Sequence, residues 1–204
     1  TNMKLKLPSR SLVDHNVYLA SCILLPLWTI YWCATHWDWA SILGLYAVIA
    51  LGGLHISLFV HRCWSHRAWK PLNRWLNIYG LFMYTINFVG THFGWVSTHR
   101  KHHRLEDTPE DPHSPYYMSR WAILFWPRVK IDLSYVTDLF KDQDHMWFFK
   151  HYWHINLVLW AVLLAIDPAW LAFWFAFLGG AGFKMRLINS IGHSDPVNKS
   201  TNNR

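Results

Sequence analysis

The sequence predicts an all-α integral membrane protein with four transmembrane helices in two hairpins, interfacial helices and a cytoplasmic cap. Three observations carry this prediction. Of the 204 residues, 52% are hydrophobic and only 15% are charged, whereas a soluble domain carries about 25% charged residues. The chain contains 15 tryptophans, and tryptophan gathers where a membrane meets water. Long runs also lack any charged side chain, and the length favours a single domain over residues 1–204.

The expected membrane spans are four uncharged runs, at residues 17–35, 40–60, 151–166 and 168–183. The first two approach the roughly 20 residues that a helix needs to cross the hydrocarbon. Only residues 36–39 separate them, so a tight turn joins them into a hairpin. Asp167 and Pro168 separate the other two runs, and proline suits the first turn of a helix. Because this second pair is short, we expect it to use its polar flanks or to lie in a thinner region.

The distribution of basic residues agrees with this layout. All 19 Lys and Arg lie in 1–14, 61–150 or 184–204, and none lies in the two expected outer turns. Two hairpins place these segments on one side of the membrane, which the positive-inside rule identifies as cytoplasmic. We therefore assign the cap to 61–150 and 184–204. The alternative is a soluble helical core with basic loops, but long runs flanked by Trp fit a membrane better. Basic loops that meet anionic lipid explain the charge without nucleic acid.

The segment between the two hairpins has a mixed pattern. Residues 72–96 are apolar but interrupted by polar side chains. A third span here would place the histidines before and after it on opposite faces of the membrane, so we expect an interfacial or re-entrant helix on the cytoplasmic side. Residues 105–119 are acidic and rich in proline, which indicates a loop. Residues 121–149 mix aromatic and charged side chains, as amphipathic surface helices do.

Six of the 14 histidines fall in three clusters, which are HRCWSH with His61 and His66, HRKHH with His99, His102 and His103, and NSIGH with His193. On a helix, positions 99 and 103 share a face with 102 beside them, so the three imidazoles should point the same way. Imidazole is a good ligand for iron, zinc or copper, and residues 60–105 contain no Asp or Glu. A single tetrahedral zinc needs four ligands. Six candidates therefore indicate two metals, and redox-active iron suits an apolar substrate.

The other histidines carry less signal. A lone histidine is more often a surface or core residue than a ligand, and this is our interpretation of His15, His36, His145, His151 and His154. His55 and His92 lie near the clusters but outside their pattern, and we interpret His113 as a residue that supports a ligand or pins a loop. Two alternatives stay open, namely a basic solvated helix for HRKHH and a non-enzymatic metal or haem protein. Haem would need histidine pairs inside facing spans, whereas these clusters lie at or beyond the span ends.

HRCWSH, then HRKHH followed by EDTPEDPH, then NSIGH after the last span resemble the membrane fatty acid desaturases of the stearoyl-CoA and acyl-lipid desaturase type. The resemblance runs in the same order from about residue 40 to residue 203. It implies four transmembrane helices and a cytoplasmic cap that holds two irons through histidines. It also implies an enzyme that uses dioxygen and two electrons to remove two hydrogens from an acyl chain.

By this resemblance the iron ligands are the six clustered histidines, His61, His66, His99, His102, His103 and His193. Asn189 matches a position near the metal through water, and Asp107, Asp111 and His113 match the acidic stretch after the second cluster. The implied partners are an acyl-CoA or acyl-lipid substrate, membrane lipid, and an electron donor of the cytochrome b5 or ferredoxin type. Four basic residues could contact a phosphate-bearing head group or an acidic electron donor, namely Arg62, Arg67, Lys70 and Arg74. The alternative is that they serve only to set the topology.

The chain departs from the family pattern in three places. A further histidine cluster is expected soon after the last residues, but the sequence stops at Arg204. One alternative is therefore a fragmentary, inactive chain. His55 and Phe59 stand where small residues are usual, and His92 stands where a Gly-Pro-like turn is common. The remaining alternative is a hydroxylase, ketolase or alkane oxygenase of the same histidine-box superfamily, because the same iron site can insert oxygen.

Overall fold

The computed structural model describes residues 11–106, 108–114, 117–125 and 132–191, with side chains from residue 21 onward; Asp107 and His193 lie outside this part of the chain. Every regular element in it is a helix, which confirms the all-α prediction for the described residues. In chain order the elements are α1 (Ser11–Thr35), α2 (Trp39–His55), η1 (Ile56–Ser65), α3 (Arg74–Ile86), α4 (His92–Leu105), α5 (Arg120–Phe125), η2 (Leu133–Val136), η3 (Leu139–Lys141), α6 (Gln143–Ile166) and α7 (Pro168–Ile191).

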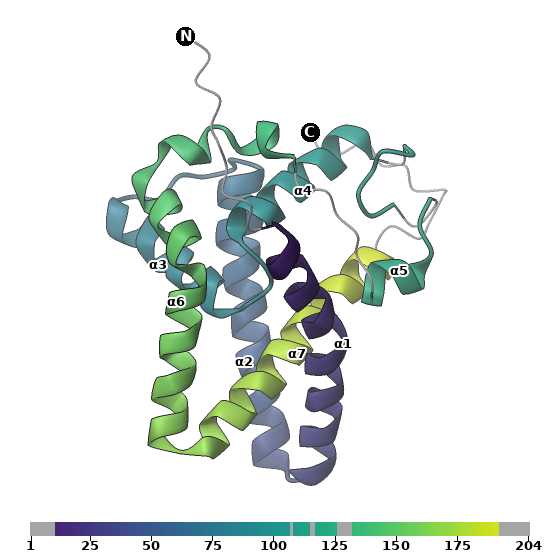
Figure 1. Ribbon diagram of the computed structural model, residues 1–204, viewed down its shortest axis with the longest axis vertical. Helices are drawn as coiled ribbons and strands as arrows, with labels where there is room; N and C mark the ends of the chain where they lie inside the picture. The colour runs from purple at the N-terminus through teal and green to yellow at the C-terminus, as the bar shows by residue number, and fades with distance from the viewer. Residues whose placement is uncertain (1–10, 107, 115–116, 126–131, 192–204) are drawn as a thin grey trace.

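The four long helices form two hairpins whose turns lie at the same end of the molecule (Figure 1). Between α1 and α2, the Asp38 side chain accepts a hydrogen bond of 2.8 Å from the backbone N–H of Ser41 and caps α2. Between α6 and α7 stands only Asp167, and Pro168 is the first residue of α7. Both turns therefore lie where the sequence predicts them.

Three helices are long and apolar enough to cross a membrane, with 27, 24 and 24 residues at Trp39–Ser65, Gln143–Ile166 and Pro168–Ile191. The apolar helical segment Ser21–Thr35 in α1 is shorter. α6 begins before the predicted cap boundary at residue 150, because the Asp142 side chain caps it by accepting from the N–H groups of Asp144 and His145. α7 likewise continues past residue 183. Both helices of the second hairpin thus extend into their polar flanks, as in the first of the two arrangements expected for its short uncharged runs.

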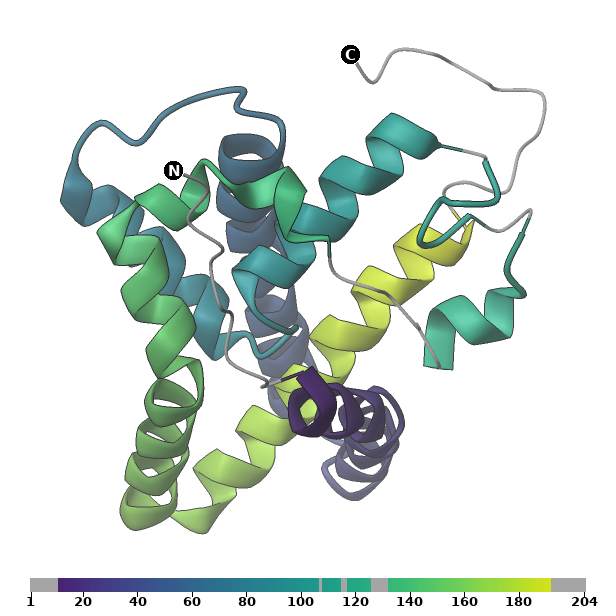
Figure 2. The same cartoon turned by 45° about the horizontal axis from the view of Figure 1, so that its top comes forward.

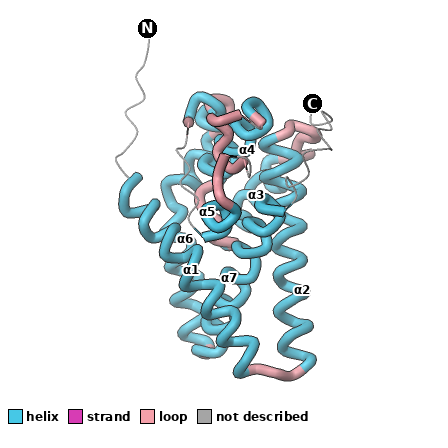
Figure 3. Tube along the Cα trace, turned by 90° about the vertical axis from the view of Figure 1, so that its right-hand side faces the viewer, coloured by secondary structure: helices cyan, strands magenta, loops and turns pink. Residues whose placement is uncertain are grey.

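α7 crosses the bundle diagonally and packs most extensively on α1 (Figures 1 and 3). Thr29 of α1 donates a hydrogen bond of 2.8 Å to the Ala176 carbonyl of α7. At the same crossing Gly179 leaves room for the Leu25 carbonyl, which a Cβ atom would overlap. Small residues permit such close contact between helices in membrane proteins. The α1–α7 crossing therefore depends on a glycine at this position.

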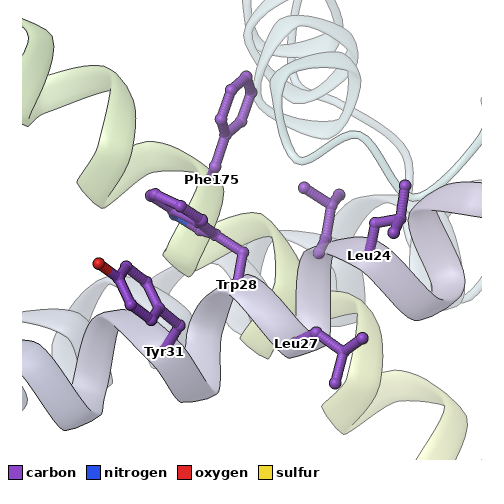
Figure 4. Close-up of a pocket in the computed structure, with 6 residues that line it drawn as sticks. Leu24, Leu27, Trp28, Tyr31 and Phe175 are labelled. Atoms are coloured by element: carbon purple, nitrogen blue, oxygen red, sulfur yellow. The ribbon is translucent and has the colours of Figure 1, made fainter.

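The long helices carry large apolar side chains on their outer surface. An open apolar groove between α1 and α7 is lined by Leu24, Leu25, Leu27, Trp28, Tyr31 and Phe175, five of which Figure 4 labels. Trp37 and Trp39, beside the turn between α1 and α2, are each 82% exposed. A soluble helical core with basic loops would bury side chains of this kind. Lipid is the surrounding that fits them.

The opposite end of the molecule carries the shorter helices and the end of η1 (Figure 2). Two helices, α3 and α4, replace the single helix expected over 72–96. Phe88, with φ of 55°, and Gly90, with φ of 92°, turn the chain between them, and Thr91 caps α4. This turn returns the chain to the same end, so no third span separates the first two histidine clusters. Short helices α5, η2 and η3 follow, in keeping with the surface helices expected over 121–149.

Candidate metal centre

A π-helix builds the first histidine pair. η1 continues α2 with hydrogen bonds between residues five apart, and the backbone N–H of His66 donates to the His61 carbonyl at 3.0 Å. Residues five apart point in different directions on an α-helix, whereas a π turn places them on one face. The Nε2 atoms of His61 and His66 consequently lie 3.0 Å apart. No periodicity in the sequence signalled this π-helix.

The second cluster completes the group from α4. His99 and His103 lie one turn apart, as their spacing predicts, with Nε2 atoms 2.9 Å apart. His66 Nε2 lies 3.0 Å from His99 Nε2 and joins the two clusters. Each of the four residues His61, His66, His99 and His103 offers a ring nitrogen, and these nitrogens all lie within 4.8 Å of one another. The two clusters therefore meet, as the sequence led us to expect.

The donor set of these four imidazoles fits a transition-metal ion. Two nitrogen ligands at right angles and about 2.1 Å from one ion are about 3.0 Å apart, and neighbouring Nε2 atoms here have this separation. Hydrogen bonds alone would satisfy the group poorly, because a neutral ring nitrogen either donates once or accepts once. Yet His66 Nε2 and His99 Nε2 each have two such neighbours. A metal ion that takes all four lone pairs removes this conflict, and iron, copper and zinc suit imidazole.

The surroundings of His66 and His99 favour the neutral form of these two rings. Burial lowers the pKa of His66, and the Arg62 guanidinium lowers it further. Burial also depresses the pKa of His99 far below its usual range, and repulsion from the neighbouring imidazoles, that of His103 first, adds to the shift. Neutral imidazole is the form that binds metal. His66 and His99 can therefore bind a metal ion without first losing a proton.

His102 belongs to a second group, with Asp111 and His113. Its ring centre lies 6.4 Å from that of His99 but stacks on His113 at 4.1 Å. Its Nδ1 lies 2.9 Å from Asp111 Oδ1, which also accepts a hydrogen bond of 3.1 Å from the His113 N–H. All three side chains are buried, with ligand atoms within 4.8 Å of one another. A carboxylate on one ring nitrogen commonly orients the other toward a metal.

The three imidazoles of α4 lie near one another, because the ring centre of His102 is 5.3 Å from that of His103. Residues three apart are neighbours on a helix but are offset around its axis. The His102 ring thereby also reaches the loop that carries Asp111. That loop supplies Asp111, the carboxylate partner of His102, whereas HRKHH itself contains no acidic residue.

Two of the basic residues considered for a head group or donor are engaged within the chain. Arg74 donates to both carboxylate oxygens of Asp144, at 2.8 and 2.7 Å. Arg67 donates to Asp138 at 2.9 Å. These ion pairs are partly exposed at the surface, where such pairs add little stability. Arg62 and Lys70 remain the candidates for contact with a head group or donor.

The remaining predicted and unassigned residues take separate positions. His55 lies outside both groups, and its Nε2 is 2.6 Å from the Tyr79 hydroxyl. His92 also lies outside them and is buried against His145, with ring centres 5.1 Å apart. Asn189 lies half-buried in the last turn of α7. The contact between His92 and His145 had no signal in the sequence, because the two are far apart in the chain.

Comparison with known proteins identifies the family. The chain matches the sequence profile described as fatty acid desaturase over residues 37–197, and it belongs to that family. It is 28% identical to Delta-9 acyl-lipid desaturase 2 of Arabidopsis thaliana, over 72% of this chain and 46% of the relative. It is 29% identical to a Delta(9)-fatty-acid desaturase of Caenorhabditis elegans, over 76% of this chain and 52% of the relative. The chain thus spans about half the length of the curated relatives it matches.

Proposed function

We propose that the protein is an integral membrane desaturase that introduces a double bond into the acyl chain of an acyl-CoA or an acyl-lipid. The observation that carries the proposal is the convergence of four imidazoles from η1 and α4. Membership of the fatty acid desaturase family supports it. The names of two relatives, an acyl-lipid desaturase and a fatty-acid desaturase, support it as well.

The proposed site holds two iron ions. His61, His66, His99 and His103 would hold one of them, since their ring nitrogens face one another. His102 would hold the other together with His193, and Asp111 would fix the His102 ring through Nδ1. The residues that would support the site through hydrogen bonds or water are Asn189, Asp107 and His113.

An unactivated methylene offers no handle to an acid, a base or a nucleophile, so bound iron would supply the dioxygen chemistry that the reaction requires. In the overall balance, CH2–CH2 becomes CH=CH, while dioxygen, two electrons and two protons become two water molecules. The chain itself orients the ligands. Burial keeps His99 neutral, and the Asp111 carboxylate, paired with His102 Nδ1, holds that ring in place.

The proposed topology has four spans, with α1 as the fourth, and a cytoplasmic cap. The turns of both hairpins lie at the end opposite η1 and α4 (Figure 1), and these turns contain no Lys or Arg. The positive-inside rule then places the cap in the cytoplasm. The acyl chain would reach the histidines from the bilayer. The electron donor, of the cytochrome b5 or ferredoxin type, would approach from the water side, where Arg62 and Lys70 lie.

Mass spectrometry of cellular fatty acids tests this function. The protein is produced in a host that lacks its own desaturase, beside the variant His66→Ala and the control His36→Ala at the opposite end of the molecule. We expect new monounsaturated chains with the parent and with His36→Ala, and none with His66→Ala. Hydroxylated chains in their place would favour the hydroxylase alternative. No new product from membrane-inserted, iron-loaded protein would refute the proposal.

A further inference from the structure

One arginine of α4 contacts the end of the π-helix. The Arg100 side chain is only 12% exposed. Its guanidinium donates to the Trp64 carbonyl at 2.5 Å and to the Ser65 carbonyl at 3.3 Å. It also donates to the Tyr135 carbonyl at 2.6 Å, and its two terminal nitrogens donate to Asp138 at 2.7 and 3.0 Å. A single side chain thus ties η1 and the η2–η3 segment to α4.

The two η1 carbonyls that Arg100 engages belong to the last residues of that helix. Carbonyls at a helix end lack partners within the helix and need another donor. A π-helix of this length is rare, and its final hydrogen bond, from the His66 N–H to the His61 carbonyl, aligns the first histidine pair. Arg100 therefore contacts the backbone of η1 directly before His66, at the point that sets the position of this residue.

Asp138 is the acidic partner of Arg100. It accepts hydrogen bonds from Arg100 and, at 2.9 Å, from Arg67. Arg67 has a φ of 53°, a left-handed conformation that is unfavourable for this residue type. Although burial alone would raise its pKa, the guanidinium groups of Arg100 and Arg67 lower the pKa of Asp138 to about 2. Asp138 therefore stays ionised at neutral pH, where it accepts from the mostly buried Arg100 as well as from Arg67, the residue after His66.

We propose that Arg100 and Asp138 are positioning residues that hold the end of η1 against α4 and so bring His61 and His66 to His99 and His103. We call Arg100, Asp138 and the two η1 carbonyls the clasp, and its role in holding η1 does not depend on bound metal. Its consequence for metal affinity rests on the proposed function. Neither residue offers a metal-binding nitrogen to the histidine group, so both act through the histidines that they place.

Hydrogen exchange of the metal-free full chain tests the clasp without reference to metal. The variants are Arg100→Lys, which keeps the charge but loses the fork of donors, and Asp138→Asn, which keeps the size. Their controls are Arg104→Lys, at an exposed position on the same helix, and Asp144→Asn, in the separate ion pair with Arg74. We expect residues 61–69 to exchange about tenfold faster or more in the two clasp variants and to be unchanged in the controls. Unchanged exchange in both clasp variants would overturn the proposal.

Ferrous-iron titration of the same proteins tests the link to the metal centre. Residues behind the ligands typically change metal affinity by about 10–100-fold, so we expect a loss of this size in Arg100→Lys and Asp138→Asn and none in the controls. Parent-like affinity in variants whose residues 61–69 exchange faster would overturn the positioning role. If the parent binds no iron while exchange still increases in the clasp variants, the clasp stands and the proposed function fails.

Discussion

The hairpin half of the molecule is formed by α1, α2, α6 and α7, and the cap is formed by η1 and the helices from α3 to η3. Each half has a buried hydrophobic cluster, but they differ in what else they expose or bury. The hairpin half exposes large apolar residues such as Ile30, Tyr46 and Val158. The cap region buries polar ones, including Ser97, His102 and Asp111. The first half is thus suited to an apolar surrounding, and the second combines a hydrophobic core with buried polar groups that need specific partners.

This difference explains how each half is stabilised. Between hairpin helices, close packing supplies the contact, as at Gly179 beside the Leu25 carbonyl. In the cap, each buried polar group needs a defined hydrogen bond, because an unpartnered one costs about 1–3 kcal/mol. Substitutions of buried polar groups beside the histidines should therefore alter metal binding, and substitutions at the close α1–α7 contact should alter stability alone.

The largest expected effect comes from His99, whose Nε2 adjoins those of both His66 and His103. His99→Ala removes the central ligand, so iron affinity should fall by more than the roughly 100-fold loss that marks residues behind the ligands. The metal-free protein should still fold, because position 99 lies inside helix α4 and alanine is the best helix former. Iron titration and circular dichroism measure the two results. His36→Ala is the control, and parent-like iron binding by His99→Ala would remove His99 from the ligand set.

A smaller loss of metal affinity is expected from residues that contact a ligand but not the metal. Asp111→Asn replaces the buried carboxylate that lies 2.9 Å from His102 Nδ1. The amide is a weaker partner for that ring, so affinity at the second group should fall by about 10–100-fold. Glu110→Gln removes a charge at the exposed neighbouring position and should leave affinity unchanged. Equal effects of the two substitutions would mean that local charge, and not the His102 contact, matters.

In the hairpin half the matched pair is Gly179→Ala and Gly44→Ala. A Cβ at Gly179 would overlap the Leu25 carbonyl, so this substitution should destabilise the fold by about 1–3 kcal/mol. Gly44 has no neighbour within 4 Å of an added Cβ, and alanine in a helix interior is favoured over glycine by about 0.5–1 kcal/mol. Unfolding in detergent measures both. A stabilising Gly179→Ala would contradict the close α1–α7 crossing.

The smallest expected effect is the response of the metal-free cap to acid. Burial lowers the folded-state pKa of His66 and His99 below the unfolded value, which is about 6.5. Above that pH both histidines are neutral in the folded and the unfolded state, so they do not change the stability. Below that pH the unfolded chain binds protons that the folded cap does not bind, so the free energy of unfolding falls as the pH decreases. Thermal unfolding at about pH 7.5 and about pH 5.5 should show a lower midpoint in acid, and a smaller drop in His99→Ala.

The sequence predicted the parts of this structure that follow from composition and spacing. Uncharged runs located both hairpins, and the i, i+4 spacing of His99 and His103 placed their rings together. The π-helix was not predictable, because HRCWSH has no period that distinguishes a π turn from an α turn. The contacts of Asp111 with His102 and of Asp138 with Arg100 were also missed as pairings, because such partners are set by tertiary structure and not by local pattern.

X-ray absorption at the iron edge can show whether histidines from η1 and α4 hold iron together, as we propose. The full chain is loaded with ferrous iron without oxygen, and the parent is compared with His99→Ala. We predict a ligand shell with the scattering pattern of several imidazole rings in the parent, and a loss of imidazole scattering in the variant. A shell of oxygen or sulfur without imidazole in the parent would contradict the claim.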